Sequence, residues 1–341
     1  MTASPQPAAS LAEIRGLLQD LPGPSDAARR AAAARESGLT KPPGALGRLE
    51  ELSAWMAAWQ DRHPPTLRRP RVAVFAGNHG VAARGVSAYP AAVTQQMVAN
   101  FVAGGGAVNQ ICRGVDADLR VYELSLETPT ADFTVGPAMA DADCARAMAY
   151  GMMAVEQGVD LIALGEMGIA NTTAAAALCL ALFGGTARDW TGPGTGVSGP
   201  RYEVKLATVA AGAGLHAGAG DGLEMLRRLG GFEFAALAGA VIAARFARVP
   251  VLLDGFAATA AAAALHAVDA RLLDHCQIAH LSAEPAHGRL CAALGKRPLL
   301  DLGMRLGEAS GAALAIGLVR AAVACHEGMA TFADAGVSGP G

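Results

Sequence analysis

The chain has 341 residues, of which 52% are hydrophobic and 17% are charged, and its formal net charge is −3. This length suffices for one large α/β domain and a smaller satellite. The near-neutral charge and an aromatic content of only 5% argue against a nucleic-acid-binding protein, which usually presents a basic face. The composition favours a protein that acts on small molecules.

The six cysteines are scattered, form no CxxC pair and mostly lie in apolar runs. This pattern predicts reduced, buried thiols and a cytoplasmic protein, and it predicts neither a metal site nor a cofactor. No signal peptide is evident at the N-terminus. The apolar block 234–268 is interrupted by Arg245, Arg248, Pro250 and Asp254, so we expect no membrane span.

Residues 1–65 show helical patterns and no strand. We expect a short helix at 11–18 and a longer one at 26–37. Two prolines and two glycines make KPPGALG (41–47) a turn. An amphipathic helix is predicted at 48–61, where apolar residues recur on one stripe. This segment is therefore expected to belong to a small helical domain.

From residue 71 short apolar runs alternate with helical patterns. The six expected strands cover 71–77, 119–124, 159–164, 250–253, 277–281 and 298–302. Helices are expected at 91–104, 144–157, 202–215, 222–229, 233–246 and 311–330. The alternation predicts a doubly wound, mostly parallel six-stranded sheet with helices on both faces, in a Rossmann-like domain at 66–305. Residues 306–341 are expected to complete the small domain.

Glycine and polar residues follow five of these six strands at once, in the sequences GNHG, GEMGIANTT, DGFAAT, SAEPAHG and GMRLGEASG. Ligands of open parallel sheets bind outside the carboxyl ends of the strands. The five turns therefore predict one composite site. Glu308, in the last of them, lies in a glycine-rich turn between an expected buried strand and a helix, where a carboxylate suits a binding crevice.

The turn GEMGIANTT (165–173) opens a helix with Asn171, Thr172 and Thr173. Free N–H groups and hydroxyls there could hold a phosphate or carboxylate, but Asn and Thr are also ordinary helix caps. The motif alone leaves both interpretations open. Glu166 has no capping role at its position, which favours a functional site.

Other polar clusters are ambiguous on their own. TGPGTGVSG (191–199) could wrap a phosphoribosyl group, although a flexible loop is the simpler interpretation, and nearby Lys205 could be merely solvated. The polar residues Asn78, His79, Ser87, Tyr89 and Gln95 could bind a substrate or only cap a loop. The glycines of 212–218 follow a helical pattern instead of a strand, which argues against a dehydrogenase. His280 and His287 lack an established metal-ligand spacing.

Taken together, the motifs resemble the nicotinate-nucleotide–dimethylbenzimidazole phosphoribosyltransferase family, which activates the lower ligand of cobalamin. They occur in order across residues 41–339 as KPPGALGRLEEL, FAGNHGVAARGVSAYP, LGEMGIANTT, TGPGTG, LLDGFAATAAA, HLSAEPAHG, PLLDLGMRLGEASGAALA and MATFADAGVSG. The resemblance implies transfer of the 5-phosphoribosyl group from nicotinate mononucleotide to 5,6-dimethylbenzimidazole, with α-ribazole 5′-phosphate and nicotinate as products. It also implies a homodimer.

The same resemblance implies roles for individual residues. Glu308 is the base that takes the benzimidazole proton, and Glu166 assists it. The substrate-binding positions implied are Ser87, Gln95 and Met167 for the benzimidazole, and Asn171, Thr172, Gly194, Lys205 and Ser282 around the ribose phosphate and nicotinate. Gly168 is a further expected substrate-binding position. The pyridinium leaves as a neutral ring, so neither an acid nor a metal is required. Inversion at C1′ places base and leaving group on opposite faces of the ribose.

Three positions depart from the family pattern. Asn78 stands where an aspartate is usual, and Ala170 and Ala309 each replace a glycine. The alanines either have negative φ at these positions or are strained there, because only glycine adopts positive φ freely. Two alternative functions stay open: a same-fold transferase with another acceptor, such as a phenol or adenine, and a non-catalytic nucleotide- or base-binding paralogue.

Overall fold

The protein is described here by a computed structural model, which covers residues 10–338. Its central sheet is parallel throughout, in the order β2-β1-β3-β4-β5. The strands are β1 (Pro70–Gly77), β2 (Asp118–Leu124), β3 (Leu161–Met167), β4 (Val251–Leu253) and β5 (Cys276–Ile278). The strand order reverses between β1 and β3, which makes the carboxyl edge there the expected ligand-binding crevice.

The central strands β1, β3 and β4 are buried on both faces, as in a doubly wound sheet, whereas the edge strand β2 is mostly exposed or half-buried. In β1, Ala73 and Phe75 belong to one core cluster, while Val72, Val74 and Ala76 belong to another on the opposite face. This alternation follows from the two-residue period of a strand. Helices therefore cover both sides, as predicted.

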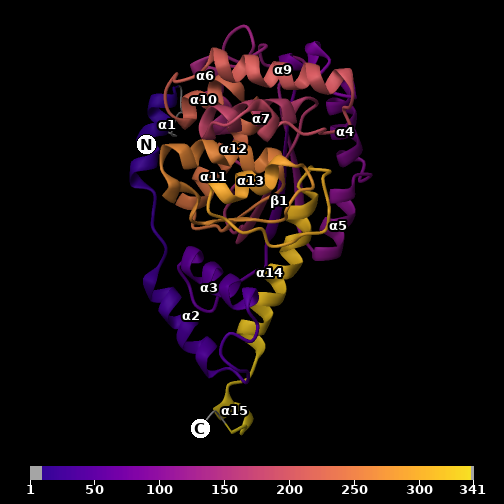
Figure 1. The fold of residues 1–341 in the computed structure, drawn as a ribbon. Helices are drawn as coiled ribbons and strands as arrows, with labels where there is room; N and C mark the ends of the chain where they lie inside the picture. The colour runs from indigo at the N-terminus through magenta and orange to yellow at the C-terminus, as the bar shows by residue number, and fades with distance from the viewer. Residues whose placement is uncertain (1–9, 339–341) are drawn as a thin grey trace, which may run out of the picture.

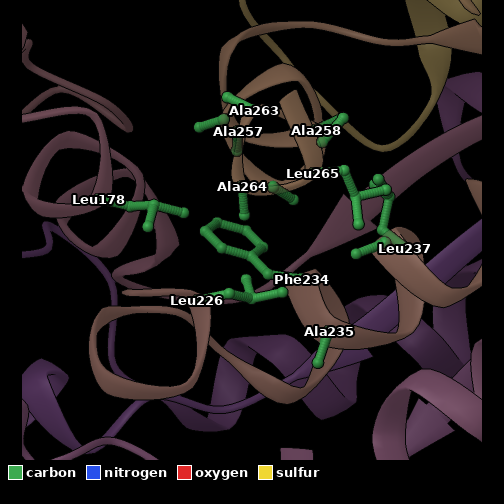
Figure 2. Packing of buried hydrophobic residues seen from close by; sticks show 14 of the residues in the cluster. Leu178, Leu226, Phe234, Ala235, Leu237, Ala257, Ala258, Ala263, Ala264 and Leu265 are labelled. Atoms are coloured by element: carbon green, nitrogen blue, oxygen red, sulfur yellow. The ribbon is translucent and has the colours of Figure 1, made fainter. Parts of the chain in front are cut away.

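One face carries most of the helices. They are α6 (Asp141–Met152), α7 (Asn171–Phe183), α10 (Gly222–Leu229), α11 (Phe232–Phe246), α12 (Phe256–Val268) and α13 (Ala286–Ala293), with α1 (Leu11–Leu17), α8 (Ala187–Trp190) and α9 (Pro200–Leu215) outside them. In Figure 2 the Phe234 ring of α11 lies among Leu178, Leu226 and Ala264. The helices approach closely: a Cβ on Gly151 would lie 1.8 Å from the Ala236 carbonyl oxygen.

The opposite face is covered by α4 (Ala92–Val102), α5 (Ala107–Val115) and α14 (Ser310–Gly328). From the sheet, α14 runs down to a smaller lobe with α2 (Asp26–Gly38), α3 (Arg48–Gln60) and α15 (Phe332–Ala335) (Figure 1). Segments from the two halves of the chain meet in this lobe, where an antiparallel bridge joins Leu39 to Thr331. The domain boundaries at residues 65 and 305 stay a prediction.

The sheet has five strands, so the predicted sixth strand at 298–302 is wrong. Residues 299–300 form a few backbone hydrogen bonds with 278–281, and these amount to an isolated parallel bridge between His280 and Leu300 instead of a strand. Pro298 has no N–H to donate to a ladder, and Leu302 is already 60% exposed where the chain leaves the sheet. Too few residues remain alongside β5 to form a strand.

Strand β3 is longer than the predicted 159–164 and continues through Glu166 and Met167. These two residues pair with Phe75 and Ala76 of the neighbouring strand β1, which extends equally far. The predicted turn therefore begins only at Gly168. No helix within residues 10–338 is long and apolar enough to cross a membrane.

Candidate active site

A cavity of about 610 Å³ opens at the carboxyl edge of the sheet, where the strand order reverses. Its wall is built from the residues that follow β3, β4 and β5, from helix α4, and from the turn before α14. The lining residues are Tyr89, Val93, Met97, Glu166, Met167, Gly168, Ile169, Asn171, Thr172, Gly194, Thr195, Gly255, Phe256, Ala257, Ser282, Glu284, Arg305, Leu306, Gly307 and Glu308. The structure thus brings four of the predicted strand-end turns together.

Most of the residues predicted for the site line this cavity, namely Glu166, Met167, Gly168, Asn171, Thr172, Gly194, Ser282 and Glu308. Three others do not: Ser87, Gln95 and Lys205. Gln95 is exposed on α4, which turns Val93 and Met97 toward the cavity instead. Residues four apart share a helix face, whereas a residue two positions on points elsewhere.

Lys205 lies immediately behind the wall and is only 1% exposed. Its Nζ donates to Thr172 Oγ1 and to the Gly192 carbonyl oxygen, both at 2.9 Å. Burial lowers the pKa of this amine to about 8. The prediction that it could be a solvated lysine is therefore wrong, because α9 packs its side chain inward against α7.

The two carboxylates of the site lie on adjacent segments. The backbone N–H of Glu308 donates to the carbonyl oxygen of Glu166 at 3.2 Å, and the Glu166 side chain accepts a hydrogen bond from Asn171 Nδ2. Burial, followed by the negative charges of Asp254 and Glu233, raises the pKa of Glu166 to about 8. Both glutamates can therefore hold or release a proton near neutral pH.

Glu308 is 7% exposed, and burial, followed by the charge of Asp254, raises its pKa to about 7. Its backbone φ is 60°, and that of the next residue, Ala309, is 59°. Two consecutive residues in the left-handed region form a sharp turn that few L-residues adopt. This turn directs the Glu308 side chain into the cavity wall at the start of α14.

Of the two alternatives for the departing alanines, the structure shows the strained one. Ala170 has a φ of 77° and Ala309 a φ of 59°, so both keep the left-handed conformation that a glycine would adopt without strain. Surrounding contacts hold them there: a Cβ on Gly165 would lie 2.2 Å from the Ala309 nitrogen. The third departing residue, Asn78, is buried and its Nδ2 donates to the Leu126 carbonyl oxygen at 2.8 Å, outside the cavity.

One part of the cavity wall carries cationic groups and a glycine turn. Arg305 Nη1 donates to the Gly194 carbonyl oxygen at 3.0 Å, and Glu284 accepts from the Gly194 N–H at 3.2 Å. A Cβ on Gly194 would lie only 2.6 Å from Thr172 Oγ1 and 3.0 Å from Lys205 Nζ. Glycine at this position therefore lets the turn pack directly against Thr172 and the Lys205 amine, which stays buried.

Arg305 and Glu284 were not predicted as site residues. Both lie in strand-end turns that the sequence pattern did single out, GMRLGEASG and SAEPAHG. Their position in these turns was the one feature of the sequence that could have marked them as site residues. The side of the turn that each residue faces depends on packing and could not be predicted from the pattern.

Apolar side chains line another part of the cavity. Tyr89, Val93 and Met97 contribute from α4 and the loop before it, and Met167 and Leu306 contribute from the sheet edge and the turn. Tyr89 is 53% exposed and Leu306 is 56% exposed at this mouth. A flat aromatic ligand suits such a surface, because its ring removes apolar area from water. No group of three or more His, Cys, Asp or Glu side chains within residues 10–338 is arranged to hold a metal ion.

Fold and site together define a phosphoribosyltransferase, and a family model with the description "Phosphoribosyltransferase" matches residues 21–337. A nicotinate-nucleotide–dimethylbenzimidazole phosphoribosyltransferase of Rhizobium etli (strain CIAT 652) is 59% identical over 328 residues, 96% of this chain and 97% of the relative. One of the same name from Brucella anthropi is 56% identical, with the same coverage. The chain therefore belongs to the nicotinate-nucleotide–dimethylbenzimidazole phosphoribosyltransferase family.

Solved structures agree with this assignment. A crystal structure of the nicotinate-nucleotide–dimethylbenzimidazole phosphoribosyltransferase from Thermus thermophilus superimposes with a TM-score of 0.86 at 40% sequence identity, covering 93% of this chain and 100% of that one. A structure of CobT from the same organism gives a TM-score of 0.87 at 41% identity, covering 92% of this chain and all of the other.

Proposed function

We propose that this chain transfers the 5-phosphoribosyl group of nicotinate mononucleotide to 5,6-dimethylbenzimidazole, giving α-ribazole 5′-phosphate and nicotinate for cobalamin assembly. One observation carries the proposal: Glu166 and Glu308 face a single cavity, whose lining combines apolar side chains with Arg305 and a glycine turn. Such a cavity suits one flat heterocycle and one sugar phosphate. Membership of the family supports the same substrates.

The phosphate of the nucleotide is proposed to bind at the cationic part of the cavity. Arg305 on the cavity wall and the Lys205 amine behind it supply positive charge there, and Thr172 in the first turn of α7 adds a hydroxyl. The positive end of the α7 helix dipole adds to this attraction for an anion. Gly194 packs directly against Thr172 and the buried Lys205 amine, and so holds the turn that forms this part of the cavity. Ser282 is the proposed hydroxyl donor on the far side.

The benzimidazole is proposed to occupy the apolar part between α4 and the turn before α14. Val93, Met97 and Met167 form one side of this space, and Leu306 forms the other. Burying the methylated ring there brings its nitrogens to the carboxylates at the base of the cavity. Ser87 and Gln95 are retained as proposed contacts at the mouth, to be tested by substitution.

In the proposed reaction one benzimidazole nitrogen attacks C1′ of the ribose with its lone pair. The bond from C1′ to the pyridinium nitrogen breaks, and its electron pair returns to the ring, so nicotinate leaves without protonation of that nitrogen. The other benzimidazole nitrogen gives its proton to Glu308. A base with a pKa of about 7 is well matched to this task at neutral pH.

Glu166 is proposed to assist by orienting the acceptor. Its pKa of about 8 means that it is mostly protonated at pH 7, so it can donate a hydrogen bond while Glu308 accepts the proton. Two neighbouring carboxyls with different proton affinities commonly divide acid and base roles in this way. We further propose a cytoplasmic homodimer, on the strength of the family resemblance.

The test is turnover. The purified protein is mixed with nicotinate mononucleotide and dimethylbenzimidazole, and nicotinate and α-ribazole 5′-phosphate are followed by chromatography. Stoichiometric appearance of both products is expected. Folded protein that binds both compounds without releasing nicotinate would overturn the proposal and favour a binding paralogue. Replacing dimethylbenzimidazole with adenine or a phenol in parallel reactions identifies a different preferred acceptor.

A further inference from the structure

Asp254 is a buried carboxylate behind the cavity wall. It follows β4 directly, is fully buried, and is not among the residues that line the cavity. Its Oδ1 accepts a hydrogen bond from the backbone N–H of Ala312 at 2.8 Å, while its Oδ2 has no hydrogen-bond partner among residues 10–338. A buried carboxylate oxygen left unpaired is destabilising, so its presence calls for an explanation.

The backbone N–H of Ala312, which donates to Asp254, belongs to the first turn of α14. This helix begins two residues after Glu308. The first N–H groups of a helix have no partner within the helix and are usually satisfied by a capping side chain. The cap position here is Ala309, which has no polar side chain. Asp254 supplies the missing acceptor from a different strand end, and its negative charge suits the positive end of the helix.

His280 holds the same turn from a second side. It is only 1% exposed, and its Nε2 lies 3.5 Å from Asp254 Oδ1. A Cβ on Gly311 would lie 2.0 Å from His280 Cδ2, so the imidazole is in contact with the backbone of the first helical turn. The start of α14 is thus enclosed between Asp254 and His280.

The charge of Asp254 also reaches the two glutamates of the cavity. After burial, it is the next largest cause that raises the pKa of Glu166 and of Glu308. Without this charge, both carboxyls would lose their protons at lower pH. One residue therefore affects both the position and the protonation of Glu308.

Other titratable groups face this region from every neighbouring element. Glu233 of α11 adds negative charge near Glu166, and Arg305 lies on the cavity wall in the turn itself. Burial lowers the pKa of His287 on α13 to about 4, so it is neutral at pH 7. Burial also lowers the pKa of His280, but Asp254 outweighs it and the net shift is upward.

We propose that Asp254 is a positioning residue, which holds the first turn of α14 and with it the Glu308 carboxylate against the cavity, and whose negative charge helps Glu308 to take up a proton. This rests on the proposed role of Glu308 as base. Asp254 does not line the cavity and acts through the two glutamates and the helix.

The first experiment compares pH profiles. Asp254→Asn keeps the shape of the side chain and the oxygen that accepts from Ala312, but it removes the negative charge. The acidic limb of the pH profile of kcat should therefore move to lower pH by about one unit. The plateau kcat should fall severalfold, because Glu308 becomes a weaker base, while KM for nicotinate mononucleotide changes less than about twofold. Asp274→Asn, an exposed aspartate before the amino end of β5, is the matched control and should behave as wild type.

A second variant separates position from charge. Gly311→Ala introduces a Cβ that must displace His280 or the helix start without changing any charge. It should lower kcat at least tenfold and leave the pH of the acidic limb unchanged. A wild-type kcat in correctly folded Gly311→Ala would overturn the positioning half of the proposal, and an unmoved acidic limb in Asp254→Asn would overturn the charge half.

A third measurement does not depend on turnover. The midpoint of thermal unfolding is recorded between about pH 5 and pH 9 for wild type, Asp254→Asn and Asp274→Asn. The raised pKa values make wild-type stability fall as pH rises through neutrality, and this fall should be shallower only in Asp254→Asn. Coincident curves would overturn the proposal. Wild-type protein that releases no nicotinate would overturn the proposed function instead, while the unfolding curves would still decide the role of Asp254.

Discussion

The main chain of Glu308 is hydrogen-bonded to the main chain of Glu166, N–H to carbonyl oxygen, at 3.2 Å. This bond joins the turn before α14 to the end of β3 and fixes two carboxylates on one wall of the cavity. Their separation along the chain is 142 positions, so only the tertiary structure, which places the turn before α14 against the end of β3, brings them together. The relative position of the two side chains is therefore set by a hydrogen bond between their main chains.

The first prediction concerns the base. Glu308→Gln should lower kcat by roughly 10²–10⁴-fold with little change in substrate binding, because an amide has the same shape but cannot take a proton. Single-turnover nicotinate release measures the effect, and calorimetric binding of nicotinate mononucleotide serves as the control. A near-wild-type kcat would transfer the base role to Glu166.

The second prediction concerns stability against pH. The pKa of Glu166 is about 8 in the folded protein, above its ordinary value of 4.5, so the folded state retains a proton that the unfolded state loses. The free energy of unfolding should therefore decrease as pH rises from about 4.5 to about 8. Glu166→Gln removes this titration and should stabilise the protein at pH 8 by on the order of 2 kcal/mol.

Urea unfolding of Glu166→Gln at pH 5 and pH 8 measures this difference, with Glu327→Gln on the exposed end of α14 as a control. The gain should be larger at pH 8 than at pH 5. Equal gains at both pH values would contradict a raised pKa for Glu166. The same variant should lose activity, a common relationship between stability and function in active sites.

The third prediction concerns backbone strain. Ala170→Gly should raise the free energy of unfolding by about 0.5–1 kcal/mol, because glycine adopts a φ of 77° without the steric penalty of a Cβ. Ala309→Gly should act in the same direction at φ 59°. Ala213→Gly inside α9 is the control and should destabilise by about the same amount. Destabilisation by all three would show that side-chain packing outweighs strain at the two turns.

The fourth prediction concerns the contact beneath the turn. Gly165→Ala would place a Cβ 2.2 Å from the Ala309 nitrogen, so the turn that carries Glu308 must move. We expect a loss of stability of about 1–3 kcal/mol, as in overpacked cores, and a loss of kcat of at least tenfold. Thermal unfolding and steady-state kinetics measure both effects. Full activity in Gly165→Ala would mean that the position of the turn is not critical.

Much of the fold and of the candidate site could be predicted from the sequence alone. Short apolar runs followed by glycine and polar residues predicted parallel strands with functional turns, because the carboxyl ends of parallel strands share one edge. Glu308 and Glu166 were chosen on that ground, and both line the cavity. Helix boundaries such as Gly222–Leu229 were predicted to the residue, since caps and periodicity are local signals.

Only the tertiary structure decided the rest. The missing sixth strand, the buried amine of Lys205 and the outward direction of Gln95 depend on which neighbours pack against each segment. The positive φ of Ala309 is imposed by contacts with residues distant in sequence, against its local preference. Asp254, which had no predicted role, acquires its place because β4 ends beside the start of α14. Local patterns determine elements, whereas the surroundings of a side chain are set by segments far along the chain.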